Sequence, residues 1–73
     1  MSYQTILLRK ENHIAVLTLN RPEKMNTING QMERELAAAL REISEDPKVR
    51  VMVLAAAGEK AFCAGGDISD TDP

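Results

Sequence analysis

Two short apolar runs open the chain, and a polar stretch separates them. Residues 5–9 and residues 14–19 are rich in Ile, Leu and Val. Runs of this length and composition are typical of β-strands. Residues 10–13 between them are polar and favour a turn. We therefore predict two strands, at residues 5–9 and 14–19, that form a hairpin.

A longer segment with helical periodicity follows a proline-containing break at residues 20–26. Asn29 is a good helix N-cap, and the pair Asp46-Pro47 is typical of a helix end. Apolar residues recur between them at spacings of three and four, on one predicted helix face: Met32, Leu36, Ala39, Leu40 and Ile43. The other face carries Glu33, Arg34, Arg41, Glu42 and Glu45. The apolar stripe could bind a partner, but a core position is favoured because a strand follows at once.

A third run, residues 49–56, is apolar on both faces of a predicted strand. This pattern is expected of a strand that is covered on both sides, usually in a parallel sheet. A helix between two strands implies a right-handed crossover that makes the strands parallel. We therefore predict the α/β class, with the order strand, strand, helix, strand, in one domain or part of one over residues 1–73.

A glycine turn, Ala64-Gly65-Gly66-Asp67-Ile68, follows the third strand. Two adjacent glycines let the backbone bend where a side chain would clash. Such a turn can direct peptide N–H groups toward an anion or a polarised oxygen, and Asp67 can cap a new helix. The turn follows the carboxyl end of a strand, where α/β folds commonly bind ligands. A Gly-Gly pair is also common in ordinary loops, so the turn alone does not define a site.

Composition excludes several classes of function. Nine Lys and Arg against eleven Asp and Glu give a net charge of −2, which does not favour nucleic-acid binding. No apolar run approaches the ~18 residues of a membrane span, and no signal-peptide pattern opens the chain. Cys63 is the only cysteine, which fits a reducing, cytoplasmic compartment and excludes a disulfide framework. We expect a soluble, cytoplasmic protein without nucleic-acid or membrane partners.

Few other residues predict chemistry. His13 at the hairpin tip is either a catalytic base or a solvated turn residue, and the turn is favoured because no nucleophile lies near it in sequence. Asp67, Asp70 and Asp72 suggest either a metal cluster or a solvated end. The end is favoured because calcium-loop spacing is absent, so no metal site is predicted. No glutamate has a sequence position that predicts a tuned pKa: Glu11, Glu23, Glu33, Glu35, Glu42, Glu45 and Glu59.

Three blocks of sequence resemble the amino-terminal part of the crotonase family, the enoyl-CoA hydratase/isomerase superfamily. They are residues 14–22 (IAVLTLNRP), residues 24–29 (KMNTIN) and residues 61–68 (AFCAGGDI). Their order, and the helix and strand between them, also match. The resemblance covers essentially the whole chain and implies the amino-terminal part of a crotonase-like ββα superhelix.

The resemblance implies an acyl-CoA enzyme whose substrate is the coenzyme A thioester and which needs no further cofactor. Family members polarise the thioester carbonyl with two backbone N–H groups, and the first corresponds here to Gly66. The residues implied to line the adenine and pantetheine pocket are Ala64, Gly65, Gly66, Asp67 and Ile68. The residues implied to meet the CoA backbone are Lys24, Met25, Asn26 and Thr27. Lys24 would either face the CoA phosphates or remain a solvated loop residue.

Two departures from the family pattern concern the subtype. Gly66 stands where simple hydratases often have alanine, and this form resembles naphthoate synthases and hydroxyisobutyryl-CoA hydrolases. Thr27 stands where alanine is usual. The resemblance therefore leaves open whether the parent enzyme is a hydratase, isomerase, synthase or hydrolase.

Truncation is the larger departure from the family. The second oxyanion N–H, the catalytic carboxylates and the trimer-forming helices of the family lie downstream of the matched segment. We expect the chain to be an inactive fragment of a hydratase or isomerase that forms trimers or hexamers. The alternative is a truncated, non-catalytic module that binds CoA or serves in assembly. The isolated chain is expected to associate through its third strand.

Overall fold

A computed structural model describes residues 3–60 and 62–67. Its elements are β1 (Ile6–Glu11), β2 (Ile14–Leu19), the short 3-10 helix η1 (Pro22–Lys24), α1 (Gly30–Glu45) and β3 (Val51–Ala56). The predicted order of strand, strand, helix, strand is confirmed. Compared with the prediction, β1 is shifted along the chain and β3 begins later, at Val51.

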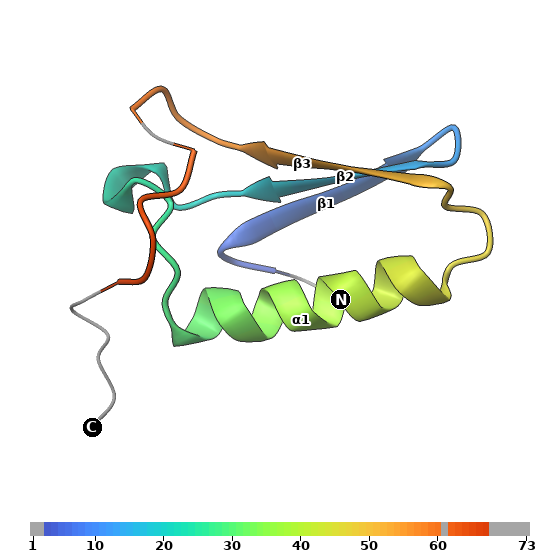
Figure 1. Ribbon diagram of the computed structural model, residues 1–73, viewed down its shortest axis with the longest axis horizontal. Helices are drawn as coiled ribbons and strands as arrows, with labels where there is room; N and C mark the ends of the chain where they lie inside the picture. The colour runs from blue at the N-terminus through green and yellow to red at the C-terminus, as the bar shows by residue number, and fades with distance from the viewer. Residues whose placement is uncertain (1–2, 61, 68–73) are drawn as a thin grey trace.

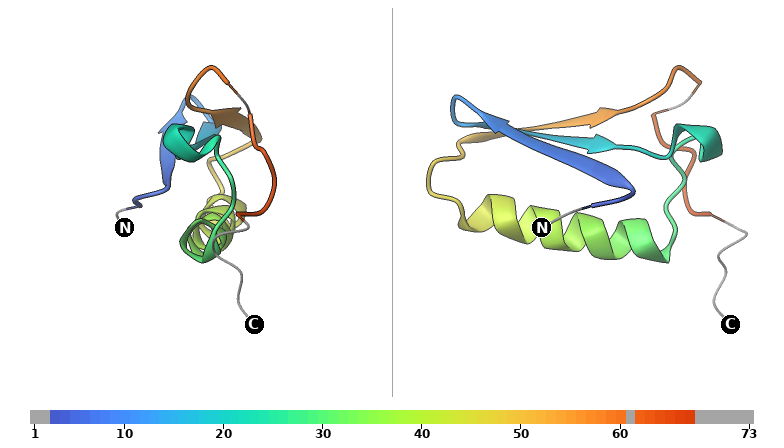
Figure 2. Two further views of the ribbon diagram at one scale, coloured as in Figure 1. Left: turned by 90° about the vertical axis from the view of Figure 1, so that its left-hand side faces the viewer. Right: turned by 180° about the vertical axis from the view of Figure 1, so that it is seen from behind.

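The three strands form one sheet in the order β1-β2-β3 (Figure 1). β1 pairs antiparallel with β2, and β2 pairs parallel with β3. The crossover through α1 therefore makes β2 and β3 parallel, as predicted. Figure 2 shows the sheet as one layer and α1 as a second layer along one of its faces. The carboxyl ends of β2 and β3 consequently lie at the same end of the molecule.

The hairpin between β1 and β2 turns on two residues, Asn12 and His13. Both have left-handed backbones, with φ angles of 52° and 69°. Two successive residues with positive φ are typical of the turn that matches the twist of a hairpin. Strand pairing can therefore continue to Glu11 and Ile14, and the turn is shorter than the predicted residues 10–13.

The core lies between α1 and the face of the sheet formed by alternate strand residues. Its buried apolar members are Ile6, Ala15, Leu17, Leu19, Met32, Ala39 and Ile43. Leu36 is partly buried against this cluster, but Leu40 is 45% exposed. The predicted helix stripe is therefore correct except at Leu40.

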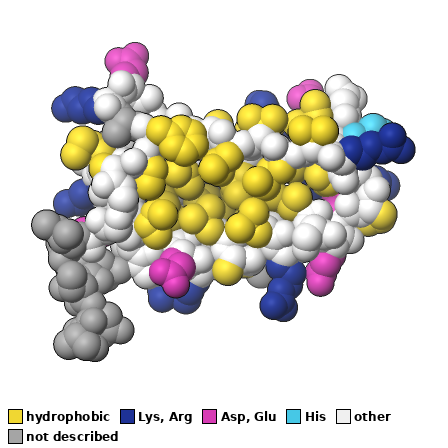
Figure 3. Space-filling model, in the orientation of Figure 1, with side chains coloured by type: hydrophobic (Ala, Val, Ile, Leu, Met, Phe, Trp, Pro, Cys, Tyr) yellow, Lys and Arg dark blue, Asp and Glu magenta, His cyan; other side chains and the backbone are white. Residues whose placement is uncertain are grey.

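β3 is far more exposed than its sequence predicts. Four successive apolar side chains, Val51 to Leu54, are 41–54% exposed. The prediction of a strand covered on both faces is wrong for this structure. The reason is that β3 forms an edge of the sheet, while the buried residues of α1 pack against β1 and β2. An apolar surface is therefore open along β3 (Figure 3).

Asn29 caps the amino end of α1, as predicted. Its side-chain Oδ1 accepts a hydrogen bond from the backbone N–H of Met32 at 2.8 Å. We expect Asn29→Ala to lower the free energy of unfolding by about 1 kcal/mol, because one N–H at the helix end loses its partner. Urea denaturation followed by circular dichroism measures this change. Asn29→Ser is the matched control and retains most of the stability; equal losses in both variants would exclude a capping role.

Candidate functional site

Two segments meet at the end of the sheet where β2 and β3 terminate. One is the loop of residues 20–29 after β2, and the other is the segment after β3, which is described over residues 57–60 and 62–67. Figure 1 shows them side by side, with η1 in the loop and the glycine turn next to it, and hydrogen bonds join them. This end therefore contains residues from both segments that the sequence analysis proposed for CoA binding.

The loop is held in a compact turn by its own backbone. The N–H groups of Lys24 and Asn26 both donate to the carbonyl of Arg21, at 3.0 Å and 2.8 Å. Met25 and Asn26 have left-handed backbones, with φ angles of 53° and 55°. Pro22 begins η1, where a missing N–H costs nothing. The loop is therefore ordered by local contacts.

Asn26 ties this loop to the end of β3. Its side chain is fully buried, with 0% exposure. Oδ1 accepts a hydrogen bond from the N–H of Arg21 at 2.7 Å, and Nδ2 donates to the carbonyl of Ala57 at 2.8 Å. These contacts give the Asn26 side chain a structural role, and its predicted contact with CoA stays a prediction.

The glycine turn pairs with the loop like a short parallel strand. The N–H of Ala64 donates to the carbonyl of Met25 at 3.1 Å. Ile28 then makes two bonds: its N–H donates to Gly65 at 2.8 Å, and its carbonyl accepts from the N–H of Asp67 at 2.9 Å. Gly65 has a φ of +101°, which L side chains rarely adopt, so glycine is required there.

The N–H of Gly66 points away from the loop. The N–H of Gly66 belongs to the same trans peptide group as the carbonyl of Gly65, and in a trans peptide these two groups point in opposite directions. That carbonyl accepts the hydrogen bond from Ile28, so the N–H of Gly66 is directed away from the loop. Gly66 is exposed, and among the described residues its N–H has no hydrogen-bond partner. The turn therefore presents one fixed backbone donor outward.

Arg21 joins the loop and the glycine turn through its guanidinium group. Nη1 donates to the carbonyl of Thr27 at 2.6 Å, and Nη2 donates to Oδ2 of Asp67 at 3.1 Å. The side chains of this ion pair are only 12% and 11% exposed. No role for Arg21 was predicted from the sequence. Its partner, Asp67, lies far away along the chain, and no short motif around Arg21 indicates this contact.

Gly58 is a second residue that sequence reasoning missed. Its φ is +90°, and a Cβ atom at this position would lie 2.8 Å from Cβ of Pro22. Glycine therefore allows the segment after β3 to approach the start of η1 closely. A single glycine after a strand gives no sign of this contact.

The structure brings together most of the nominated residues. Lys24 and Met25 are exposed on the loop, and Ala64, Gly65 and Gly66 are exposed on the turn beside it. Thr27 and Asp67 are partly buried, and both contact Arg21. Ile68 lies outside the described residues.

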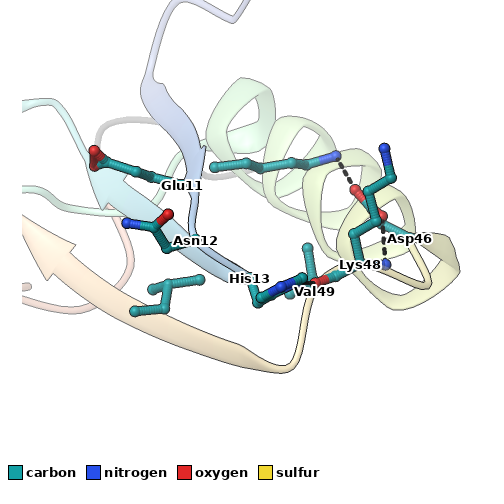
Figure 4. A pocket seen from close by; sticks show the side chains of 8 residues that line it. Glu11, Asn12, His13, Asp46, Lys48 and Val49 are labelled. Carbon is teal, nitrogen blue, oxygen red and sulfur yellow. Dashed lines mark hydrogen bonds and ion pairs between the residues drawn. The ribbon is translucent and has the colours of Figure 1, made fainter.

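His13 lies at the opposite end of the sheet, beside a hollow of about 290 Å³ (Figure 4). Its Nδ1 is 2.7 Å from the carbonyl oxygen of Lys48. Because a carbonyl only accepts, Nδ1 carries the proton in this contact. Nearby, Nζ of Lys10 contacts Oδ2 of Asp46 at 2.9 Å. The ring thus links the hairpin turn to the turn after α1. This contact favours a structural role for His13 over a catalytic one.

Residues 3–60 and 62–67 contain no group of three or more His, Cys, Asp or Glu that would hold a metal ion. Asp70 and Asp72 lie outside these ranges. No helix in the described part of the chain is long and apolar enough to cross a membrane.

Glu35 departs from the prediction that no glutamate of the chain has a shifted pKa. Its Oε1 accepts hydrogen bonds from the N–H and Oγ1 of Thr5, at 2.8 Å and 2.9 Å, and from the N–H of Gln4 at 3.0 Å. Burial raises the pKa of Glu35, but the hydrogen bonds from Thr5, Gln31 and Gln4 outweigh burial, and its pKa lies below the ordinary value. Glu35 therefore anchors the start of β1 to α1.

A carboxylate with a lowered folded-state pKa stabilises the fold above its unfolded pKa, and the stabilisation is lost as the pH falls through the folded value. We expect Glu35→Gln to be destabilising near neutral pH and to lose less stability below about pH 4.3 than the unchanged protein. Urea denaturation between about pH 6 and pH 3 measures the difference. The control is Glu45→Gln, at an exposed position of the same helix. Parallel pH profiles for the unchanged protein and Glu35→Gln would refute this role.

Comparison with known proteins gives consistent matches. A sequence model of the enoyl-CoA hydratase/isomerase family matches residues 9–72. The crotonyl-CoA hydratase of Syntrophomonas wolfei is 39% identical over 69 residues, which cover 94% of this chain and 26% of that protein. The mitochondrial 3-hydroxyisobutyryl-CoA hydrolase of Bos taurus is 46% identical over 63 residues, 86% of this chain and 16% of that protein.

Solved structures agree with these sequence matches. An enoyl-CoA hydratase/isomerase from Mycobacterium paratuberculosis superposes with a TM-score of 0.88 at 37% identity, over 92% of this chain and 26% of that chain. An enoyl-CoA hydratase from Mycobacterium marinum gives a TM-score of 0.87 at 36% identity, over 96% of this chain and 35% of that chain. The chain thus spans between 16% and 35% of the length of these relatives.

Proposed function

Because the chain belongs to the enoyl-CoA hydratase/isomerase family, we propose that it is the amino-terminal segment of an acyl-CoA enzyme of the hydratase or isomerase type. In this proposal the N–H of Gly66 donates a hydrogen bond to the thioester carbonyl oxygen. The observation that carries it is the outward, unpaired N–H of Gly66, held between two hydrogen bonds to Ile28.

The proposed chemistry requires a donor that is fixed before the reaction starts. Proton transfer at the acyl chain shifts negative charge onto the thioester oxygen, and a preorganised N–H stabilises that charge. The neighbours of Gly66 are bonded to the loop, and Arg21 anchors Asp67. The donor therefore needs little reorganisation to meet the developing charge.

The CoA portion is proposed to follow the surface formed by residues 24–27 and 64–67, and Ile68, which lies outside the described residues, is proposed as a further contact. Lys24 and Met25 are exposed beside the exposed residues of the glycine turn. The ammonium group of Lys24 suits contact with the CoA phosphates. Asn26 supports this surface from below, because its side chain is fully buried.

The other parts of the reaction are proposed to come from the rest of a parent enzyme. The catalytic carboxylates and the second oxyanion donor lie beyond residue 73 in this proposal, and the parent is a cytoplasmic trimer or hexamer without a cofactor. The chain alone is then inactive. In the described residues, the carboxylate of the glycine turn is Asp67, which is bound to Arg21 and suits anchoring better than proton transfer.

A second candidate function is a non-catalytic module that binds CoA. Asp67 forms an ion pair with Arg21 and is therefore poorly suited to proton transfer, which favours this second candidate. Calorimetric titration of the 73-residue chain with CoA and with an acyl-CoA tests this module. Binding without turnover supports it, and the absence of binding to either compound rules it out.

The oxyanion role is tested by Gly66→Pro in the parent enzyme. Proline deletes the N–H, so kcat is expected to fall by about 10²–10³-fold or more. Gly66→Ala is the matched control, because it retains the N–H and its Cβ would meet no atom within 4 Å. We expect kcat of this control to stay far closer to that of the unchanged enzyme. Near-normal turnover by a folded Gly66→Pro variant would contradict the proposal.

A further inference from the structure

The glycine turn receives little support from packing at its two glycines. A Cβ atom added to Gly65 or to Gly66 would meet no atom of the described residues within 4 Å. Glycine also has more backbone freedom than any other residue, and here two glycines are adjacent. The direction of the Gly66 N–H therefore depends on the polar contacts that restrain the turn.

Two of these contacts are backbone hydrogen bonds to one residue, Ile28. They join Ile28 to the carbonyl of Gly65 at 2.8 Å and to the N–H of Asp67 at 2.9 Å. A further contact is the ion pair in which Nη2 of Arg21 lies 3.1 Å from Oδ2 of Asp67. This pair restrains the turn from a second point of the loop, so the turn is less able to rotate about its bonds to Ile28.

Arg21 is itself held by the loop. Its N–H donates to the buried side chain of Asn26 at 2.7 Å, and its Nη1 donates to the carbonyl of Thr27 at 2.6 Å. Because the guanidinium group is planar and rigid, its bond to Thr27 also orients the nitrogen that contacts Asp67. The side chains of Arg21 and Asp67 are only 12% and 11% exposed, so water screens their attraction less than at an exposed site.

We propose that Arg21 is a positioning residue for the oxyanion donor, and that it acts through Asp67 to fix the direction of the Gly66 N–H. This inference rests on the function proposed above, in which that N–H meets the thioester oxygen and residues 24–27 contact CoA. Arg21 does not touch the substrate in this proposal. Its guanidinium group joins the CoA loop, at Thr27, to the turn that contains the donor, and so sets their relative position.

Steady-state kinetics of the parent enzyme give the first test. A hydrogen-bond donor acts mainly on the transition state, and a displacement of about 1 Å can cost about 10²-fold in rate. We therefore expect Arg21→Met to lower kcat by about 10–10²-fold and to change KM less. Lys10→Met is the matched control, because it removes another ion-paired cation at the opposite end of the sheet. Equal kcat values for a folded Arg21→Met variant and this control would overturn the proposal.

The carbonyl stretch of a bound thioester reports the donor independently of the amount of folded enzyme. Butyryl-CoA labelled with carbon-13 at the thioester carbonyl is the probe, because its saturated chain cannot be hydrated. Hydrogen bonding lowers the stretching frequency, and we expect a smaller lowering in Arg21→Met than in the unchanged enzyme or Lys10→Met. Arg21→Lys keeps the charge without the planar fork and should be intermediate; it also provides the test if Arg21→Met does not fold. A full lowering in both folded Arg21 variants would overturn the proposal.

Gly66→Pro distinguishes a failure of this inference from a failure of the proposed function. This variant lacks the N–H, so the lowering should shrink, and adding Arg21→Met should have no further effect. A full lowering in Gly66→Pro would overturn the proposed function and this inference with it. A reduced lowering in Gly66→Pro, together with an equal effect of Arg21→Met in the presence and absence of the Gly66 N–H, would overturn the positioning role alone.

Discussion

Replacing Asn26 with alanine is expected to lower the free energy of unfolding by about 3 kcal/mol or more. The N–H of Arg21 and the carbonyl of Ala57 both lose their partner, and an unsatisfied buried group costs about 1–3 kcal/mol. Alanine also tolerates the left-handed backbone at this position, φ 55°, less well than asparagine. A loss of this size is comparable to the total stability of a small domain. Urea denaturation, with a stabilising osmolyte if needed, measures it.

The chain contains a matched control for the backbone contribution. Asn12 has a similar φ of 52°, but it is exposed in the hairpin turn. Asn12→Ala is therefore expected to show the backbone cost alone, about 1–2 kcal/mol. Asn26→Asp separates the two bonds, because it retains the acceptor for Arg21 and loses the donor to Ala57. Equal losses in Asn12→Ala and Asn26→Ala would show that the buried contacts contribute nothing.

Arg21→Ala is expected to have the second large effect, about 3–5 kcal/mol. Breaking a largely buried ion pair from one side leaves the other charge without compensation, and Asp67 is only 11% exposed. Arg21 bonds both the loop and the glycine turn, so its loss should lower the local stability of these two segments as well as the free energy of unfolding. Amide hydrogen exchange at Ile28 and Asp67 should accelerate more than exchange in β2.

A double-mutant cycle with Asp67→Asn isolates the pair itself. Arg21→Lys keeps the charge but lacks the fork that contacts both Thr27 and Asp67, so it should rescue only part of the loss. Lys10→Ala removes an exposed cluster with Glu42 and Asp46 and should change stability little. If Arg21→Ala is as mild as Lys10→Ala, the pair does not organise this end of the sheet.

The elements that sequence predicted well are those set by local patterns. Asn29 marks the start of α1, and the apolar spacing after it sets the buried helix face. The strands follow from β-branched apolar runs, and the parallel crossover follows from chain order. These features depend on residues within a few positions of one another, so one sequence is enough to reveal them.

The features that sequence missed depend on distant pairs or on coverage. The partners of Arg21 and Glu35 lie far away along the chain, at Asp67 and Thr5, and no spacing rule connects them. The exposure of β3 depends on which element lies next to it, which its apolar pattern alone does not specify. The glycine turn therefore marked the place of the candidate site, but the groups that hold the turn were not identified.

The bonds that fix Gly66 have a consequence for the order in which a longer parent would be made. The groups that hold the segment around Gly66 in place, on Arg21, Met25 and Ile28, all precede it in the chain. On the ribosome these groups emerge first, and the turn can dock onto them as soon as it leaves the exit tunnel. We therefore expect the proposed Gly66 donor to be positioned during synthesis, before the second proposed oxyanion donor, downstream of residue 73, has folded against it.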